Sequence, residues 1–203
     1  LAFRVIPYRA ALFLGWINAW LGFHIVRFRV KEAKRRIRLV FGDELEEREV
    51  RDIAWQSWRN LVFTAVETLR MDLMGTDIEH IMDGSELFQT LKRQCDTGQG
   101  AIAAVSHMGS WEVSGAYMRS MDVPVFTIVG KQRNPLVNDY LNSMRERAGV
   151  DAVPRHSTTL RRIIRELNEG KLLGIMADVR MRSGGIQVPF LGGQANVGEG
   201  MAS

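Results

Sequence analysis

The residues best suited to chemistry lie in the string Ser106-His107-Met108-Gly109-Ser110-Trp111-Glu112. His107 and Glu112 form a His-x-x-x-x-Glu pair at the junction between a predicted strand and a predicted helix. An imidazole that is oriented by a carboxylate can accept a proton from a hydroxyl group, which makes the hydroxyl oxygen nucleophilic. The pair therefore predicts general-base catalysis on a substrate hydroxyl, with a chance pairing that has no catalytic role as the alternative.

Two elements must position this pair. The apolar run 100–106 predicts a buried strand, and the helical period of apolar residues over 110–121 predicts a helix. Residues five apart in one helix are separated by roughly 140° around its axis, so the pair can meet only if His107 lies in the turn before the helix. Glu112 then lies in the first helical turn, where the helix dipole favours an ionised carboxylate. Gly109 allows a substrate or a backbone segment to approach closely.

Three basic residues are candidates for binding the substrate. Lys131 and Arg133 directly follow the predicted strand 123–129, and Arg145 lies on the helix that comes next. Guanidinium and ammonium groups bind phosphate, and they can also stabilise the oxyanion of a tetrahedral intermediate. For each of the three, a solvated charge at the flank of a helix is the alternative.

A carboxylate and another arginine follow a later strand. Asp178 ends the apolar strand 171–177, and Arg180 comes two residues after it. A carboxylate in such a place is costly unless it is paired or used. Because the carboxyl ends of parallel strands share one edge of a sheet, we expect these residues to lie at the same rim as His107. Asp178 and Arg180 are therefore further candidates for binding the substrate.

Strands and helices alternate along the second half of the chain, after the helical regions 44–74 and 85–94. The predicted strands are 100–106, 123–129, 151–153, 171–177 and 186–191, and the predicted helices between the first four are 110–121, 135–147 and 157–169. Such alternation is typical of an α/β fold with a mainly parallel sheet flanked by helices.

The N-terminal region differs from the rest in charge. Residues 1–40 hold nine basic residues and one acidic residue, a net +8, although the whole chain carries only +4. The apolar segment 10–26 is close to the lower length limit for a membrane span, about 17 residues. An apolar, aromatic-rich helix next to basic residues is also typical of a membrane interface. With a buried core helix as the alternative, we expect a membrane-associated helical region whose basic residues 27–38 face the cytoplasm.

Composition limits the organisation of the chain. We expect residues 1–40 to be a basic, apolar membrane-associating segment and residues 41–203 to be a single α/β domain, truncated at its C-terminus where a helix is predicted to begin at residues 201–203. The single cysteine, Cys95, excludes an internal disulfide and suits a cytoplasmic environment. The sequence lacks metal-ligand spacing and phosphate-binding glycine loops, so we expect neither a metal nor a bound cofactor.

Four blocks, in order along the chain, resemble the bacterial lipid A biosynthesis (lauroyl/myristoyl) acyltransferase family, which is distantly related to lysophospholipid acyltransferases. The string 107–112 resembles the first motif of the family, and 131–136 (Lys-Gln-Arg-Asn-Pro-Leu) resembles the second. The stretch 145–149 resembles its Arg-x-x-x-Gly block, and Asp178 with 184–192 resembles its Asp followed by a Val-Pro-Phe-Phe-Gly strand. The chain departs from the family at positions that include Lys131, where arginine is usual, and Val179, where glutamine or histidine is frequent.

The resemblance implies a glycerolipid-acyltransferase-like fold and an O-acyltransferase activity. Such an enzyme moves a fatty acyl group from an acyl carrier protein or CoA thioester to a hydroxyl of a lipid A precursor or similar glycolipid, at the cytoplasmic face of the bacterial inner membrane. The thioester is a co-substrate, so no other cofactor is implied. A non-catalytic membrane-lipid-binding module of the same fold is the alternative. No nucleic-acid partner is expected, because the basic N-terminus carries no recognisable nucleic-acid-binding motif.

Overall fold

The computed structural model of the protein describes residues 2–73, 82, 86–156, 158–176, 178–181 and 183–198. The chain divides into two compact units, one formed by 1–67 together with 178–203 and the other by 68–177. The boundary expected between residues 40 and 41 stays a prediction. The helix expected at residues 201–203 lies outside the described residues.

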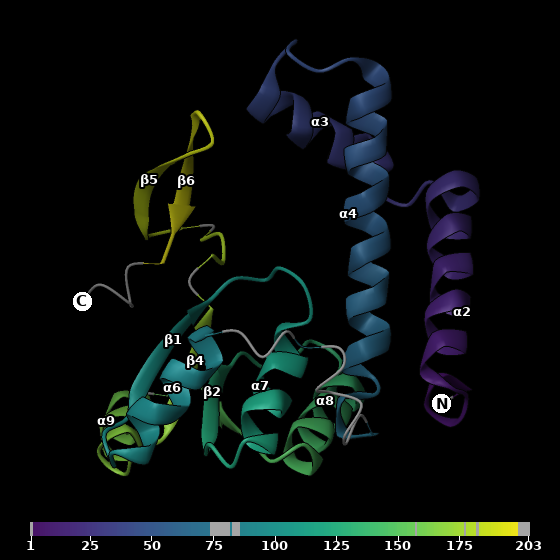
Figure 1. The fold of residues 1–203 in the computed structure, drawn as a ribbon. Coiled ribbons are helices and arrows are strands. Elements are labelled where there is room, and N and C mark those ends of the chain that lie inside the picture. The colour runs from purple at the N-terminus through teal and green to yellow at the C-terminus, as the bar shows by residue number, and fades with distance from the viewer. Residues whose placement is uncertain are drawn as a thin grey trace. The chain divides into compact units, whose positions relative to one another are not determined.

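The unit 68–177 is built on a four-stranded sheet whose paired strands are all parallel (Figure 1). The strands, in their order across the sheet, are β1 (Ala101–Val105), β4 (Leu172–Met176), β2 (Val125–Val129) and β3 (Val150–Pro154). This sheet confirms the predicted α/β fold with a mainly parallel sheet, and each strand falls within two residues of its predicted bounds.

The order of the strands explains where the helices lie. The connecting helices are α7 (Trp111–Ser120), α8 (Pro135–Arg147) and α9 (Thr159–Asn168), preceded by α6 (Glu86–Asp96). From β1 through β2 to β3 the chain advances in one direction across the sheet, and from β3 to β4 it returns. Because connections between parallel strands are right-handed, the advancing helices α7 and α8 cover one face and the returning helix α9 covers the other.

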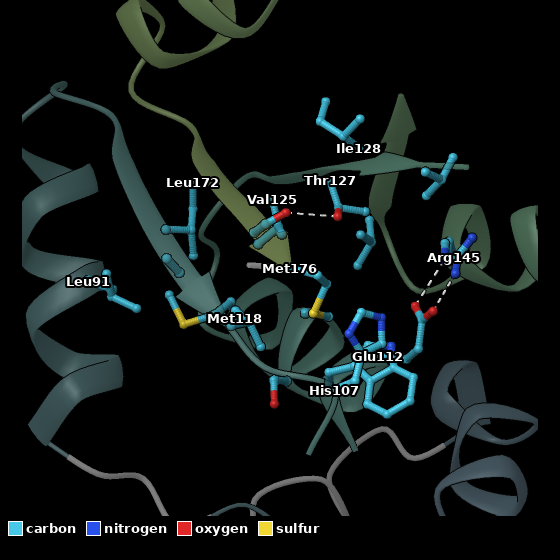
Figure 2. Close-up of a pocket in the computed structure, with 18 of the residues that line it drawn as sticks. Leu91, His107, Glu112, Met118, Val125, Thr127, Ile128, Arg145, Leu172 and Met176 are labelled. Atoms are coloured by element: carbon cyan, nitrogen blue, oxygen red, sulfur yellow. Dashed lines mark hydrogen bonds and ion pairs between the residues drawn. The ribbon is translucent and has the colours of Figure 1, made fainter. Parts of the chain in front are cut away.

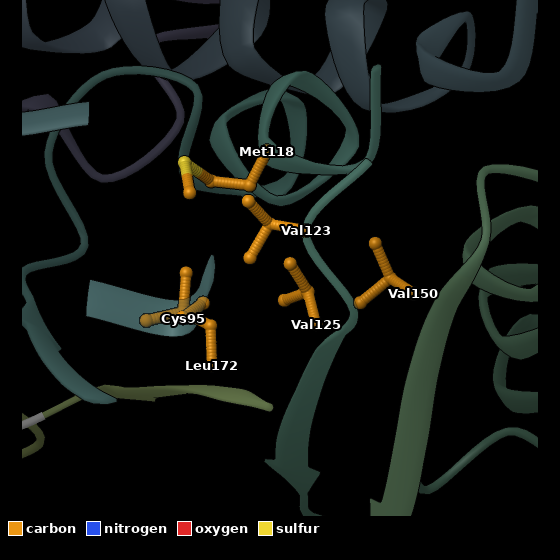
Figure 3. Packing of buried hydrophobic residues seen from close by; sticks show 6 residues of the cluster. All are labelled: Cys95, Met118, Val123, Val125, Val150 and Leu172. Atoms are coloured by element: carbon orange, nitrogen blue, oxygen red, sulfur yellow. The ribbon is translucent and has the colours of Figure 1, made fainter. Parts of the chain in front are cut away.

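Each face of the sheet has its own apolar core, because successive side chains of a strand point to opposite sides. The α6–α7 face buries six side chains, shown in Figure 3: Cys95, Met118, Val123, Val125, Val150 and Leu172. Burial also raises the pKa of the Cys95 thiol, which keeps this group neutral in the core. The α9 face buries Phe126, Val153 and Leu173, with side chains of α9 packed against them.

The start of α8 follows from two neighbouring residues. Asn134 precedes the helix, and its side-chain oxygen accepts a hydrogen bond from the backbone N–H of Leu136 at 3.0 Å. Pro135 occupies the first helical position, where its missing N–H costs nothing. The helix therefore begins and ends at the predicted residues, 135–147.

The N-terminal region is helical. It contains α1 (Ala2–Val5), α2 (Tyr8–Trp20), the π-helical continuation η1 (Leu21–Val26), α3 (Val30–Phe41) and α4 (Glu47–Thr68). The short 3₁₀-helix η2 (Met71–Leu73) lies near the start of the other unit, which begins at Thr68. Tyr8–Val26 is long and apolar enough to cross a membrane, by length and composition alone. This helix includes the apolar segment predicted at residues 10–26.

The helix 8–26 packs on α4 through its small residues. Ala11 and Ala19 are fully buried, and a Cβ added to Gly15 would meet Val66 at 3.0 Å. The indole N–H of Trp58 donates to the Ala19 carbonyl at 2.9 Å, a distance that only a close approach of the two helices allows. Small residues spaced by four are also the usual contact between helices in membranes.

Large apolar side chains of the same helix remain exposed, which suits contact with lipid. Phe13, Ile25 and Val26 are 62%, 64% and 70% exposed.

The strand predicted at 186–191 is present as β5 (Ile186–Phe190), in a two-stranded antiparallel sheet with β6 (Gly193–Val197). The sequence did not predict β6. Leu191 and Gly192 both have positive φ, 47° and 75°, as a two-residue hairpin turn requires. The Leu-Gly-Gly sequence at the turn is the signal that could have indicated this hairpin.

Candidate active site

A cavity of about 230 Å³ lies in the unit 68–177, against the face of the sheet that α6 and α7 cover. One end is polar, with His107, Glu112 and Arg145 gathered there (Figure 2). The other end is apolar and is lined by side chains that include Leu91 and Leu172. The cavity therefore offers reactive groups and an apolar compartment side by side.

His107 lies in the turn between β1 and α7, as the spacing predicted. Gly109 in this turn has φ of 60°, a left-handed conformation that a side chain would strain. The imidazole packs edge-on against the indole of Trp111, with ring centroids 5.0 Å apart and an interplanar angle of 65°. Because Trp111 is the first residue of α7, this contact fixes the imidazole beside the start of the helix.

Glu112 lies in the first turn of α7, also as predicted, and forms an ion pair with Arg145 of α8. Arg145 Nε donates to Glu112 Oε2 at 2.9 Å, and Arg145 Nη2 donates to Glu112 Oε1. Both side chains are 13% exposed. The carboxylate is thus held by two parallel charge-assisted hydrogen bonds, the strongest form of this pairing.

The model of the family described as bacterial lipid A biosynthesis acyltransferase matches residues 1–202. The chain belongs to that family. It is therefore an acyltransferase, with an acyl donor and a lipid acceptor as its substrates. A comparison with curated proteins gave no match. Membership of an enzyme family weighs against the non-catalytic alternative.

Lys131 and Arg133, the cations that the sequence predicted after β2, are not among the residues that line the cavity of this acyltransferase. Lys131 and Arg133 are exposed, and Gln132 between them lines the cavity. The backbone N–H of Gln132 donates to Asn138 Oδ1 at 3.1 Å, which ties the loop to the first turn of α8. Substrate binding by Lys131 and Arg133 stays a prediction.

Asp178 and Arg180 of the acyltransferase belong to the other compact unit. Both residues are exposed, and Arg180 forms an isolated antiparallel bridge with Val197, the last residue of β6. Their expected place at the rim near His107 and their expected role in substrate binding stay predictions.

The sequence did not single out several residues that form the walls of the cavity in this acyltransferase. Thr127 donates its hydroxyl to the Gly174 carbonyl at 2.8 Å, and both residues line the cavity. Alternate positions of β4, namely Leu172, Gly174 and Met176, face it. The period of two along a strand could have assigned these positions to one face, but it does not indicate that this face is hollow.

Proposed function

We propose that this acyltransferase moves a fatty acyl group from an acyl carrier protein or CoA thioester to a hydroxyl of a lipid A precursor or a similar glycolipid. His107 is the general base, and Glu112 orients it. The observation that carries the proposal is one cavity, in a member of this family, that joins an imidazole and a fixed carboxylate to an apolar compartment.

In the proposed reaction the acceptor hydroxyl gives its proton to His107 while its oxygen attacks the thioester carbonyl. The tetrahedral intermediate collapses, the carbon–sulfur bond breaks, and the leaving thiolate takes the proton back from the imidazolium. The products are an ester and a free thiol. No acyl-enzyme is needed, because both substrates are held together in one site.

The apolar part of the cavity is the proposed place of the acyl chain. Phe88, Leu91, Met118 and Leu172 surround this part and offer no charge. Burying a methylene group there is favourable by about 0.8 kcal/mol, so a long chain gains most of its binding energy from this compartment. The reactive thioester carbon then lies at the polar end.

The proposed location is the cytoplasmic face of the bacterial inner membrane. The apolar helix Tyr8–Val26 and the family together suggest membrane association. The basic residues 27–38 directly follow this helix, and basic flanks favour the cytoplasmic side. Thioester donors are cytoplasmic, so this face brings the donor and the lipid acceptor to the same site.

The proposal is tested with purified full-length chain in detergent, a radiolabelled acyl donor and a lipid A precursor. We expect ester formation, and we expect His107→Ala to lower turnover by about 10²-fold or more, the usual effect of losing a general base. Separate reactions with acyl carrier protein and CoA thioesters identify the donor.

His156→Ala is the matched control, because His156 is exposed and does not line the cavity. We expect its turnover to equal that of the unchanged protein. Full activity of folded His107→Ala protein would reject the mechanism.

A further inference from the structure

The guanidinium group of Arg145 is committed to protein partners through all three of its nitrogens. Nε and Nη2 hold the two oxygens of Glu112, and Nη1 donates to Asn142 Oδ1 at 3.1 Å. Asn142 lies one turn earlier on α8. The guanidinium plane is therefore fixed from both sides, by its own helix and by the first turn of α7.

Burial separates Arg145 from the exposed cations of the site. Its side chain is 13% exposed, whereas Lys131 and Arg133 are exposed to solvent. A cation that recruits a phosphate group needs its donors open to the approaching ligand, and most of those of Arg145 point at Glu112 and Asn142.

We infer that Arg145 is a positioning residue that acts on the reaction through Glu112 and not by binding substrate. This inference depends on the proposed role of His107 and Glu112. A carboxylate oxygen has two lone pairs, and the two hydrogen bonds from Arg145 Nε and Nη2 occupy one lone pair on each oxygen of Glu112. Capacity remains for an imidazole N–H, in a direction that Arg145 has fixed.

The ion pair also makes a carboxylate tolerable in this place. A charged group that is largely buried is costly unless an opposite charge and hydrogen bonds accompany it. Without Arg145, the Glu112 side chain loses both its counter-charge and its fixed rotamer. The consequence for catalysis is a misplaced orienting group, and a displacement of about 1 Å can cost about 10²-fold in rate.

A double-mutant cycle separates this role from direct binding of substrate. We compare Glu112→Gln, Arg145→Gln and the double variant, which replaces the ion pair by two amides of similar size. If Arg145 acts through Glu112, each single change lowers kcat by about 10²-fold with KM changed by less than about 2-fold. The double variant is then no slower than the slower single variant, because both changes remove one interaction.

Direct contact with a substrate phosphate gives the opposite pattern. KM for the donor or the acceptor then rises by about 10-fold or more in Arg145→Gln, and the two single effects multiply in the double variant. Either result would overturn the inference, and so would an unchanged kcat in Arg145→Gln.

Arg147→Gln is the matched control on the same helix. Arg147 pairs with Asp72 at 2.6 Å instead of with a residue of the cavity, so we expect its kcat to be unchanged. Arg145→Lys keeps the positive charge but cannot donate two parallel hydrogen bonds to Glu112. We expect it to recover part of the kcat that Arg145→Gln loses. Thermal unfolding midpoints verify that every variant is folded.

The His107→Ala result keeps this inference apart from the proposed function. If His107→Ala protein is fully active, His107 is not the general base, and the role of Glu112 on which the inference depends is rejected with it. Loss of activity in His107→Ala, together with multiplying effects at 112 and 145, overturns only the role of Arg145.

Discussion

The two faces of the parallel sheet bury similar groups but differ in what surrounds them. Leu172 and Leu173 are neighbours in β4 and are both buried, yet Leu172 borders the cavity while Leu173 packs with Phe126 and Val153 in the core beneath α9. Each face is also accompanied by a carboxylate that is largely buried, Glu112 on α7 and Glu166 on α9. The comparison of these carboxylates shows which features indicate a site.

Glu166 is paired more extensively than Glu112. Its side chain is 4% exposed, and it contacts Arg162 at 3.3 Å, Arg165 at 3.1 Å, and Lys171. Hydrogen bonds from these cations, Lys171 first, lower its pKa from 4.5 to about 2. Glu166 does not line the cavity described above, whereas Glu112 shares it with an imidazole. A buried ion pair alone therefore does not distinguish a stabilising role from a catalytic one. The cavity beside Glu112 is the feature that favours a catalytic role for that residue.

Among the changes that test the contrast between Glu166 and Glu112, Glu166→Gln is expected to have the largest effect, and this effect is on stability. The amide keeps the shape but loses the charge that three cations surround, so we expect the free energy of unfolding to fall by about 2 kcal/mol at pH 7. Turnover per folded molecule stays unchanged, because Glu166 contacts no residue of the proposed dyad. Chemical denaturation at pH 7 and the acyl-transfer assay measure the two quantities.

The pH dependence gives a second reading of the same variant. A carboxyl group whose pKa is lowered on folding stabilises the fold above its unfolded pKa, and this contribution is lost as the pH falls toward the folded value. For Glu166 the loss runs from about pH 5 down to about pH 2, given its folded pKa of about 2. The difference in stability between wild type and Glu166→Gln should shrink over this range. A difference that stays constant would show that the charge of Glu166 is not its source.

The next largest effect is expected on the choice of acyl donor, from a change on the face of the sheet that borders the cavity. A Cβ added to Gly174 would meet nothing within 4 Å, and Gly174 lines the cavity. Gly174→Leu should therefore place an apolar side chain in the cavity and shift the preference toward shorter acyl donors by about 10-fold or more, the discrimination that a change of one or more methylenes gives in an apolar pocket. Competition between donors of different chain length measures this shift.

Ile175→Leu supplies the control from the other face of the same strand. Ile175 packs against Phe126 and Leu173 and does not line the cavity described above, so this change of shape should leave the preference for chain length unaltered. If folded Gly174→Leu protein shows an unaltered profile as well, the acyl chain binds elsewhere and the contrast between the faces fails.

Local signals in the sequence were enough to predict most of the sheet unit. Asn134 and Pro135 fixed the start of α8, and the alternation of apolar runs predicted the parallel sheet. The positions of His107 and Glu112 followed from their spacing across one turn. These features depend on residues that are close in the sequence, where propensity and period are informative.

The parts that were not predicted depend on residues far apart in the sequence. Arg145 is 33 residues from Glu112, and only the packing of α8 beside α7 brings them together. Lys131 and Arg133 were predicted from their charge, yet Gly130 and Gln132 are the residues of that loop that line the cavity. The direction of each side chain in a short loop is set by tertiary contacts, here by the hydrogen bond from Gln132 to Asn138.

The smallest change in stability is expected from a substitution at Glu32. It tests whether burial or the lowered pKa determines how much a paired carboxylate stabilises the fold. Hydrogen bonds from Arg35 and Arg36 lower the pKa of Glu32 to about 2, the same value as for Glu166. The Glu32 side chain, however, is 40% exposed on α3, and pairs of this kind are screened by water and salt. We expect Glu32→Gln to leave the thermal unfolding midpoint unchanged within error, while Glu166→Gln lowers it clearly. Equal losses in the two variants would mean that the pKa shift, and not burial, sets the contribution of an ion pair in this protein, and the contrast drawn from Glu166 would then lose its basis.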